Sequence, residues 1–316
     1  MSLNAQPKSS GRALIWALLA VAATIGLGIP IYRASSQSAL GTASPLSGQG
    51  VNTASVPPAI LELFQKQAGS PPWNRDTAAK TQVILQQCAA LQQLLTTGAA
   101  DATFSNALAA STLRASVFMT FGESLYNSGD THRAEMFFVS LVRDHPTRVT
   151  ARQLSRCHLW IARIHKDQAL AWKYQQQSPD QAAPEFQTAL EHFLVAKDVD
   201  ATNDTARDVG WLNAASCYHE LGIETLRQGC FVGLLAETNP SPIYRDMANY
   251  LLAASYTEQH RWQDALAVCQ PMYDRLTATL ASGQPEYGGQ ANYLALIKSA
   301  MDLCTAQLAA QQGGAQ

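Results

Sequence analysis

The chain has few charged residues and almost no net charge. Lys and Arg number 22 against 24 Asp and Glu, and the formal net charge is −2. Proteins that bind the phosphates of nucleic acid usually carry a patch or stripe of basic residues. The balance of charge therefore argues against a nucleic-acid partner.

Strand-forming patterns are also scarce. After residue 50, no stretch of six or more residues alternates Val, Ile, Thr or Tyr with polar residues between turn signals. Ala, Leu and Gln make up much of the composition instead, and these residues favour helix. We therefore expect an all-α fold with little or no sheet.

Local signatures of catalysis and metal binding are missing. The sequence contains no GxSxG, HExxH, GxxxxGK[ST] or GxGxxG motif. His158 and His165 are two helical turns apart, about 10 Å along the axis, which is too far to bind one metal. These absences predict a protein that is not an enzyme and uses no cofactor and no metal, although a site built from distant residues leaves no motif.

Six cysteines lie far apart, without the CxxC or His spacing of a zinc site. We expect them to be small buried apolar residues on helices. In an oxidising compartment one or two disulfides would form, with a pairing that the spacing does not determine. The cysteines are Cys88, Cys157, Cys217, Cys230, Cys269 and Cys304.

One long apolar run lies near the N-terminus, over residues 13–32, and it contains no charge. Twenty helical residues at about 1.5 Å each match a hydrocarbon core about 30 Å thick. Lys8 and Arg12 precede the run, and only Arg33 follows it closely. The positive-inside rule then places the N-terminus in the cytoplasm.

These features predict a single-pass membrane protein that contacts the lipid bilayer. Residues 1–12 would be cytoplasmic, residues 13–32 a transmembrane anchor and residues 33–57, rich in Ser, Gly, Thr and Pro, a flexible linker. Residues 58–312 would form a helical domain in the periplasm or another extracytoplasmic space. Cleavage in the small-residue stretch 34–39, followed by secretion, is the alternative.

The most specific pattern begins at Ala115 and reads ASVFMTFGESLYNSGDTHRAEMFFVSLVRDHP. Two antiparallel helices would cross where small residues recur, with aromatic rings around the crossing, Gly129 at the turn and Pro146 at the end. The pattern consists of Phe118, Phe121, Gly122, Leu125, Gly129, Ala134, Phe138, Leu141 and Pro146. These spacings resemble the tetratricopeptide repeat, a helix-turn-helix unit of 34 residues.

The resemblance continues at lower quality along the chain. The four repeat-like units cover about 115–148, 155–203, 208–241 and 246–279, before a closing helix at about 289–311. Ala189 and Phe193 carry the resemblance in the second unit, and Tyr256 and Ala265 carry it in the fourth. About fifteen extra residues in the second unit predict lengthened helices or a protruding loop. The second helix of the third unit lacks the expected small and aromatic residues.

The resemblance implies a right-handed superhelix of antiparallel hairpins, whose first helices line a concave groove. First-helix residues that point away from the hairpin contact would bind a partner peptide or helix. They are Met119, Glu123, Tyr126, Asn127, Arg156, Arg163, Lys166, His219 and Tyr250. The Lys and Asn set that some family members use to clamp a terminal carboxylate is missing. Arg156, Arg163 and Lys166 suit an acidic or carbonyl-rich segment, and a solvated helix face explains them equally well.

The predicted function is a non-enzymatic scaffold or adaptor of a cell envelope that binds other proteins. Two alternatives remain open. One is an enzyme or small-ligand-binding protein that uses the helical solenoid as its scaffold. The other is a self-associating structural protein, because the exposed ends of a solenoid can drive formation of a homo-oligomer.

Overall fold

The structure, a computed structural model, describes residue 56 and residues 58–67, 78–200 and 202–313. All regular structure within these ranges is helical and none is strand, which confirms the predicted all-α class. The predicted N-terminal segments 1–12, 13–32 and 33–57 lie outside the described residues, apart from Val56.

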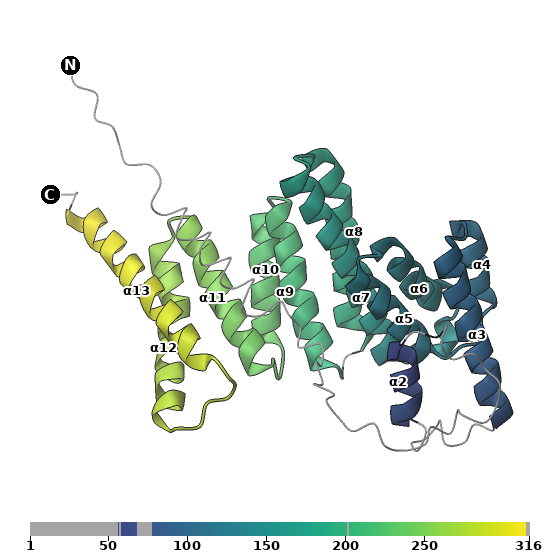
Figure 1. The fold of residues 1–316 in the computed structure, drawn as a ribbon. Helices are drawn as coiled ribbons and strands as arrows, with labels where there is room; N and C mark the ends of the chain where they lie inside the picture. The colour runs from purple at the N-terminus through teal and green to yellow at the C-terminus, as the bar shows by residue number, and fades with distance from the viewer. Residues whose placement is uncertain (1–55, 57, 68–77, 201, 314–316) are drawn as a thin grey trace. The chain divides into compact units, whose positions relative to one another are not determined.

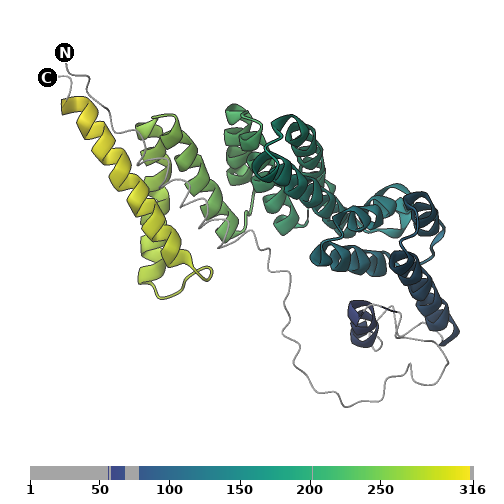
Figure 2. The same cartoon turned by 45° about the horizontal axis from the view of Figure 1, so that its top comes forward.

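The described helices follow one another as adjacent pairs (Figures 1 and 2). Three precede the pairs: α2 (Pro58–Gln67), α3 (Ala78–Thr97) and α4 (Asp101–Ala110). The pairs are α5 (Ala115–Ser128) with α6 (Thr131–Arg143), α7 (Ala151–Leu170) with α8 (Pro179–Val199), α9 (Asp204–Glu220) with α10 (Glu224–Ala236), and α11 (Pro242–Glu258) with α12 (Trp262–Ala281). The last helix, α13 (Gln290–Gly313), packs against α12 and also contacts α11.

Packing between pairs follows a regular rule. Each second helix packs against the first helix of the next pair, so α6 contacts α7, α8 contacts α9 and α10 contacts α11. The first helices also contact one another, α5 with α7, α7 with α9 and α9 with α11. Buried apolar side chains from both helices of these pairs form one cluster from α7 to α11. A second cluster joins α11, α12 and α13.

The close crossing of α5 and α6 leaves no room for a side chain at position 122, which is occupied by glycine. A Cβ atom there would lie 2.6 Å from the Phe138 ring, and both Phe138 and Ala134 are fully buried. The ring of Phe137 fills the centre of this pair, stacked on Phe121 with centroids 5.2 Å apart. The close approach therefore needs a glycine on α5 and large rings on α6.

Local signals set the ends of these helices. Gly129 adopts a left-handed conformation, with φ of 90°, and ends α5. The Asp130 side chain then accepts a hydrogen bond from the Arg133 backbone N–H at 3.2 Å and starts α6. Thr150 and Gln153 form a reciprocal capping box at the start of α7. Each device satisfies backbone groups that a helix end would leave unpaired.

The extra residues of the second unit lengthen its helices. After Leu170 the chain continues as one π-helical turn, η4 (Ala171–Gln175), and α8 begins at Pro179. Of the two predicted outcomes, the structure therefore has extended helices joined by a short connection.

The predicted localisation, a single-pass membrane protein with an extracytoplasmic domain, is corrected. Among the described residues, no helix is both long enough and apolar enough to cross a membrane. Even the 24-residue α13 carries an ion pair between Lys298 and Asp302 in its middle. The predicted anchor itself, residues 13–32, lies outside the described residues.

All six cysteines are buried and none is in a disulfide. No thiol-bearing residue is more than 3% exposed. Burial raises the pKa of these thiols, to about 12 for Cys157 and Cys217. The thiolate is the reactive form, so these groups are unreactive in the folded chain.

Candidate functional site

The residues predicted to bind a partner all lie on the first helices of the pairs. Met119, Glu123, Tyr126 and Asn127 are on α5, Arg156, Arg163 and Lys166 are on α7, His219 is on α9 and Tyr250 is on α11. Asn127, Arg156 and His219 are exposed, and Glu123, Tyr126, Arg163 and Tyr250 are partly buried. Met119 and Lys166 are buried, at 5% and 8% exposure. The side chains of Met119 and Lys166 therefore lie inside the protein and are not presented to solvent.

A polar and aromatic network joins α5 to α7. The Trp160 indole N–H donates a hydrogen bond to Glu123 Oε1 at 3.1 Å, and Arg156 Nη2 lies 2.5 Å from the same oxygen. Burial raises the pKa of Glu123, while Arg156 and Trp160 act to lower it. The carboxylate of Glu123 thus holds two residues of α7 in place.

The second half of this network contains two aromatic rings in tilted contact and a guanidinium over both of them. The Tyr126 and Trp160 ring centroids lie 5.1 Å apart, and the Arg163 guanidinium lies 5.1 Å and 5.5 Å from them. The Tyr126 hydroxyl donates a hydrogen bond to Asp167. Burial, together with Asp167, raises the pKa of Tyr126 to about 12. We call Glu123, Tyr126, Arg156, Trp160, Arg163 and Asp167 the α5–α7 face.

Polar contacts also join α7 to α9. The buried Lys166 ammonium donates to Asn213 Oδ1 at 3.0 Å, and burial lowers the Lys166 pKa. Further along, Lys173 Nζ lies 2.9 Å from a Glu220 carboxylate oxygen, and the Tyr174 hydroxyl donates to that oxygen at 2.9 Å. Buried Lys166 therefore connects helices and does not form part of an open basic surface.

The three basic residues singled out in the sequence thus all have partners within the chain. Arg156 pairs with Glu123, Arg163 lies over the rings of Tyr126 and Trp160 near Asp167, and Lys166 bonds to Asn213. Acidic and basic groups are balanced on the α5–α7 face, so its character is mixed polar and aromatic. Trp160, which is buried at 6% exposure, was not among the predicted residues.

A second cluster joins α6, α7 and α8 through three histidines. His165 lies between two carboxylates: its Nε2 is 3.2 Å from Glu135 and its Nδ1 is 2.6 Å from Glu185. The hydrogen bond to Glu135 is the largest cause that raises the His165 pKa to about 9. His165 is therefore a cation at neutral pH, held between helices α6 and α8.

The other two histidines are neutral neighbours of this cation. The Nδ1 atoms of His158 and His192 lie 2.8 Å apart, so one donates a hydrogen bond and the other accepts it. Burial lowers the pKa of both, and with the adjacent histidine charges it lowers that of His192 to about 4. The sequence excluded only a shared metal for His158 and His165, and it did not bring His192 to them.

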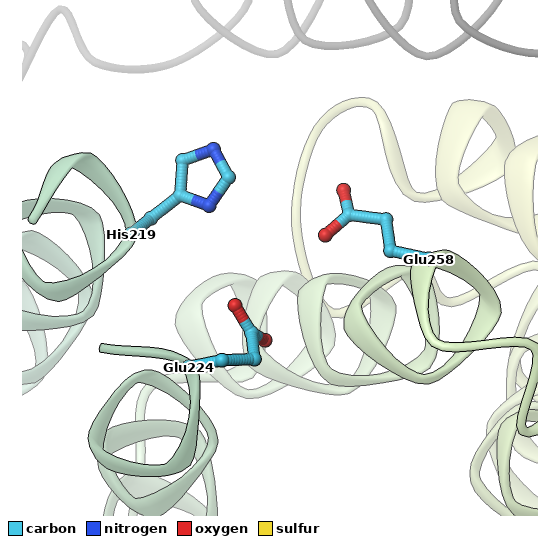
Figure 3. Close-up of side chains that lie close together, drawn as sticks. All are labelled: His219, Glu224 and Glu258. Carbon is cyan, nitrogen blue, oxygen red and sulfur yellow. The ribbon is translucent and has the colours of Figure 1, made fainter. Parts of the chain in front are cut away.

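A third cluster lies where α9, α10 and α11 meet. His219, Glu224 and Glu258 each offer one ligand atom, and these atoms lie within 4.8 Å of one another (Figure 3). Buried Arg227 places its Nη1 2.8 Å from Glu258 Oε2 and 3.1 Å from Glu224 Oε2. The sequence named only His219, because the two glutamates belong to other helices.

No protein-family model, curated protein or solved structure matches the chain.

Proposed function

We propose that the chain is a non-enzymatic scaffold, a tetratricopeptide-like right-handed superhelix that binds a peptide or helix of another protein along its first helices. The binding surface would be the row α5, α7, α9 and α11, with the α5–α7 face as its most structured part. Protein partners need no cofactor, so specificity would come from side chains on this row.

The observation that carries the proposal is an asymmetry in helix contacts. The first helices of successive pairs touch one another, from α5 to α11. Among the described helices, contacts between the second helices α6, α8, α10 and α12 are weaker or absent, although α6 also contacts α4. In a stack of hairpins, the helices that approach more closely lie on the inner side of the curve. This supports an inner row of first helices that a linear partner could follow.

The chemistry of the α5–α7 face supports the same use. Trp, Tyr and Arg are the residues that contribute most often to binding energy at protein interfaces. Here the partly buried side chains of Tyr126 and Arg163 contact the ring of Trp160, which is itself buried at 6% exposure and supports them from below the surface. Asn127 on α5 and Arg156 on α7 are exposed. The intramolecular pairs hold these side chains in fixed orientations, which reduces the entropy lost when a partner binds.

Affinity capture with paired variants tests this proposal. The full-length chain and the variant Asn127→Ala/Arg156→Ala would be used to capture partners from the source organism, followed by quantitative mass spectrometry. The matched control is Arg143→Ala/Gln187→Ala, which removes an exposed Arg and an exposed amide from the second helices α6 and α8. All three chains should show the same far-ultraviolet circular dichroism.

We expect a partner that the wild type and the control variant capture equally. The variant of the first helices should capture at least about fivefold less, since a truncated contact residue of moderate importance costs about 1 kcal/mol. Equal loss in both variants, or no loss in either, would contradict a binding surface on the first helices.

A further inference from the structure

We propose that His219, Glu224 and Glu258 form a binding site for a divalent first-row transition metal ion of the Zn²⁺ type, at the junction of α9, α10 and α11. This inference does not depend on the partner-binding proposal, because its ligands and its test involve the chain alone. Metal binding here would link one hairpin to the first helix of the next.

Convergence of three side chains from three helices is the first observation. Figure 3 shows the imidazole of His219 and the carboxylates of Glu224 and Glu258 directed toward a common space, with ligand atoms within 4.8 Å of one another. Ligands around one zinc ion, each about 2.0–2.2 Å from the metal, lie about 3–3.5 Å apart. His219 and Glu258 are exposed, so small rotations of their side chains can close this difference.

The local backbone brings the ligands together. His219 is in the last turn of α9 and Glu224 begins α10, with Gly222 between them at φ of 75°. This left-handed glycine allows a tight turn that places both side chains near one another. Glu258 is the last residue of α11, the helix that packs against both α9 and α10. The site is therefore built on helix ends whose positions are fixed by packing.

The available donor atoms favour a transition metal over Ca²⁺ or Mg²⁺. The His219 imidazole forms no side-chain hydrogen bond or ion pair with any described residue, so a ring nitrogen is available. One imidazole with two carboxylates suits Zn²⁺, Fe²⁺ or Mn²⁺, whereas Ca²⁺ takes six to eight oxygen ligands. Three protein ligands leave at least one coordination position for water or for a side chain of a partner.

Arg227 is the main competitor of a metal ion, and it also holds the carboxylates. Its guanidinium contacts one oxygen of Glu258 and both oxygens of Glu224, and the Ser255 hydroxyl donates to Glu224. Hydrogen bonds of this kind orient metal-ligating carboxylates. The charges of Arg227 and the two glutamates sum to −1, so attraction for a divalent cation remains. The remaining positive charge of Arg227 makes the affinity lower than at a closed four-ligand site.

Isothermal titration of the full chain with Zn²⁺, after removal of metal with a chelator, tests the proposal. His219→Ala is the decisive variant because it removes a ligand and leaves the ion pairs of Arg227 intact. The matched control is His132→Ala, another exposed histidine, which pairs with Asp101 on α4. A second variant, His260→Ala, removes the exposed histidine nearest in sequence to Glu258.

We expect one Zn²⁺ per chain in the wild type, an affinity at least about tenfold weaker in His219→Ala, and no change in His132→Ala or His260→Ala. Ca²⁺ should give no comparable binding. Zn²⁺ should also raise the thermal unfolding midpoint of the wild type but not that of His219→Ala, since a ligand that binds only the folded state stabilises it. Absence of binding, or equal affinity in the wild type and His219→Ala, would overturn the site and leave the two glutamates as partners of Arg227 alone.

Discussion

His165 should stabilise the protein at neutral pH and lose this effect in alkali. The imidazole lies between Glu135 and Glu185, so the folded chain holds its proton more tightly than the unfolded chain does. A group whose pKa is higher in the folded state contributes its full stabilisation below the unfolded pKa of 6.5. That contribution is lost as the pH rises through the folded value of about 9.

The magnitude follows from the two pKa values. A rise from 6.5 to about 9 corresponds to a maximum of about 3 kcal/mol. Between pH 7 and pH 10 the loss should be about 2.5 kcal/mol, because a small part has gone already at pH 7. The three side chains are 19% to 31% exposed, so added salt should reduce the effect only in part.

Comparison with His165→Gln separates this effect from other alkaline titrations. The buried cysteines also destabilise the folded chain in alkali, because their thiols ionise more readily once unfolded. This contribution is common to both proteins and cancels in their difference. Urea unfolding, followed by circular dichroism at pH 7 and pH 10, gives the free energy of unfolding of each chain.

The wild type should exceed His165→Gln by about 2.5 kcal/mol more at pH 7 than at pH 10. His132→Gln, which alters an exposed pair on the surface, should show a difference below about 0.5 kcal/mol at both values. An advantage of the wild type over His165→Gln that is the same at pH 7 and pH 10 would refute a charged histidine between the two glutamates.

Four further substitutions test other parts of the chain. Gly122→Ala should lower stability by about 1–3 kcal/mol in thermal unfolding, because the new Cβ would lie 2.6 Å from the buried Phe138 ring. Gly229→Ala, with nothing within 4 Å of the new atom, should instead raise stability by about 0.5–1 kcal/mol, and a loss there would contradict the reasoning. The low pKa of His192, about 4, contributes stability that is present above pH 6.5 and is lost as the pH falls toward 4. His192→Asn should therefore flatten the acid limb of a plot of unfolding midpoint against pH. Thr150→Ala should cost about 1 kcal/mol in urea unfolding through loss of the capping box, and an unchanged midpoint would count against it.

The fold class could be predicted because it depends on local signals. Residues at helical spacing, Gly129 at a turn and small Gly122 opposite Ala134 all act within one hairpin. In the structure Gly129 is needed for its left-handed conformation at the end of α5. Gly122 is needed because the ring of Phe138 packs directly against its backbone. Phe137 was missed because the expected pattern assigns it no role, although it fills the centre of the pair.

The candidate sites could be predicted only in part. His158 and His165 share a helix, but Glu135, Glu185 and His192 reach them from two other helices. Such contacts depend on the register of helix packing, which a spacing pattern within one helix does not contain. Burial of Lys166 has the same origin, because α9 covers that side of α7 and supplies Asn213 as its partner.

The six buried thiols give the protein its own reporters of local opening. They are distributed over α3, α7, α9, α10, α12 and α13, so nearly every pair of helices carries one. A thiol reagent can modify a given cysteine only while the helix around it is open, and the rate of labelling then measures the free energy of that opening. Contacts in such a stack are mainly between neighbours, so opening can begin at an end and spread inward. Labelling followed by peptide mass spectrometry would therefore show the order in which the hairpins open, without any substitution in the chain.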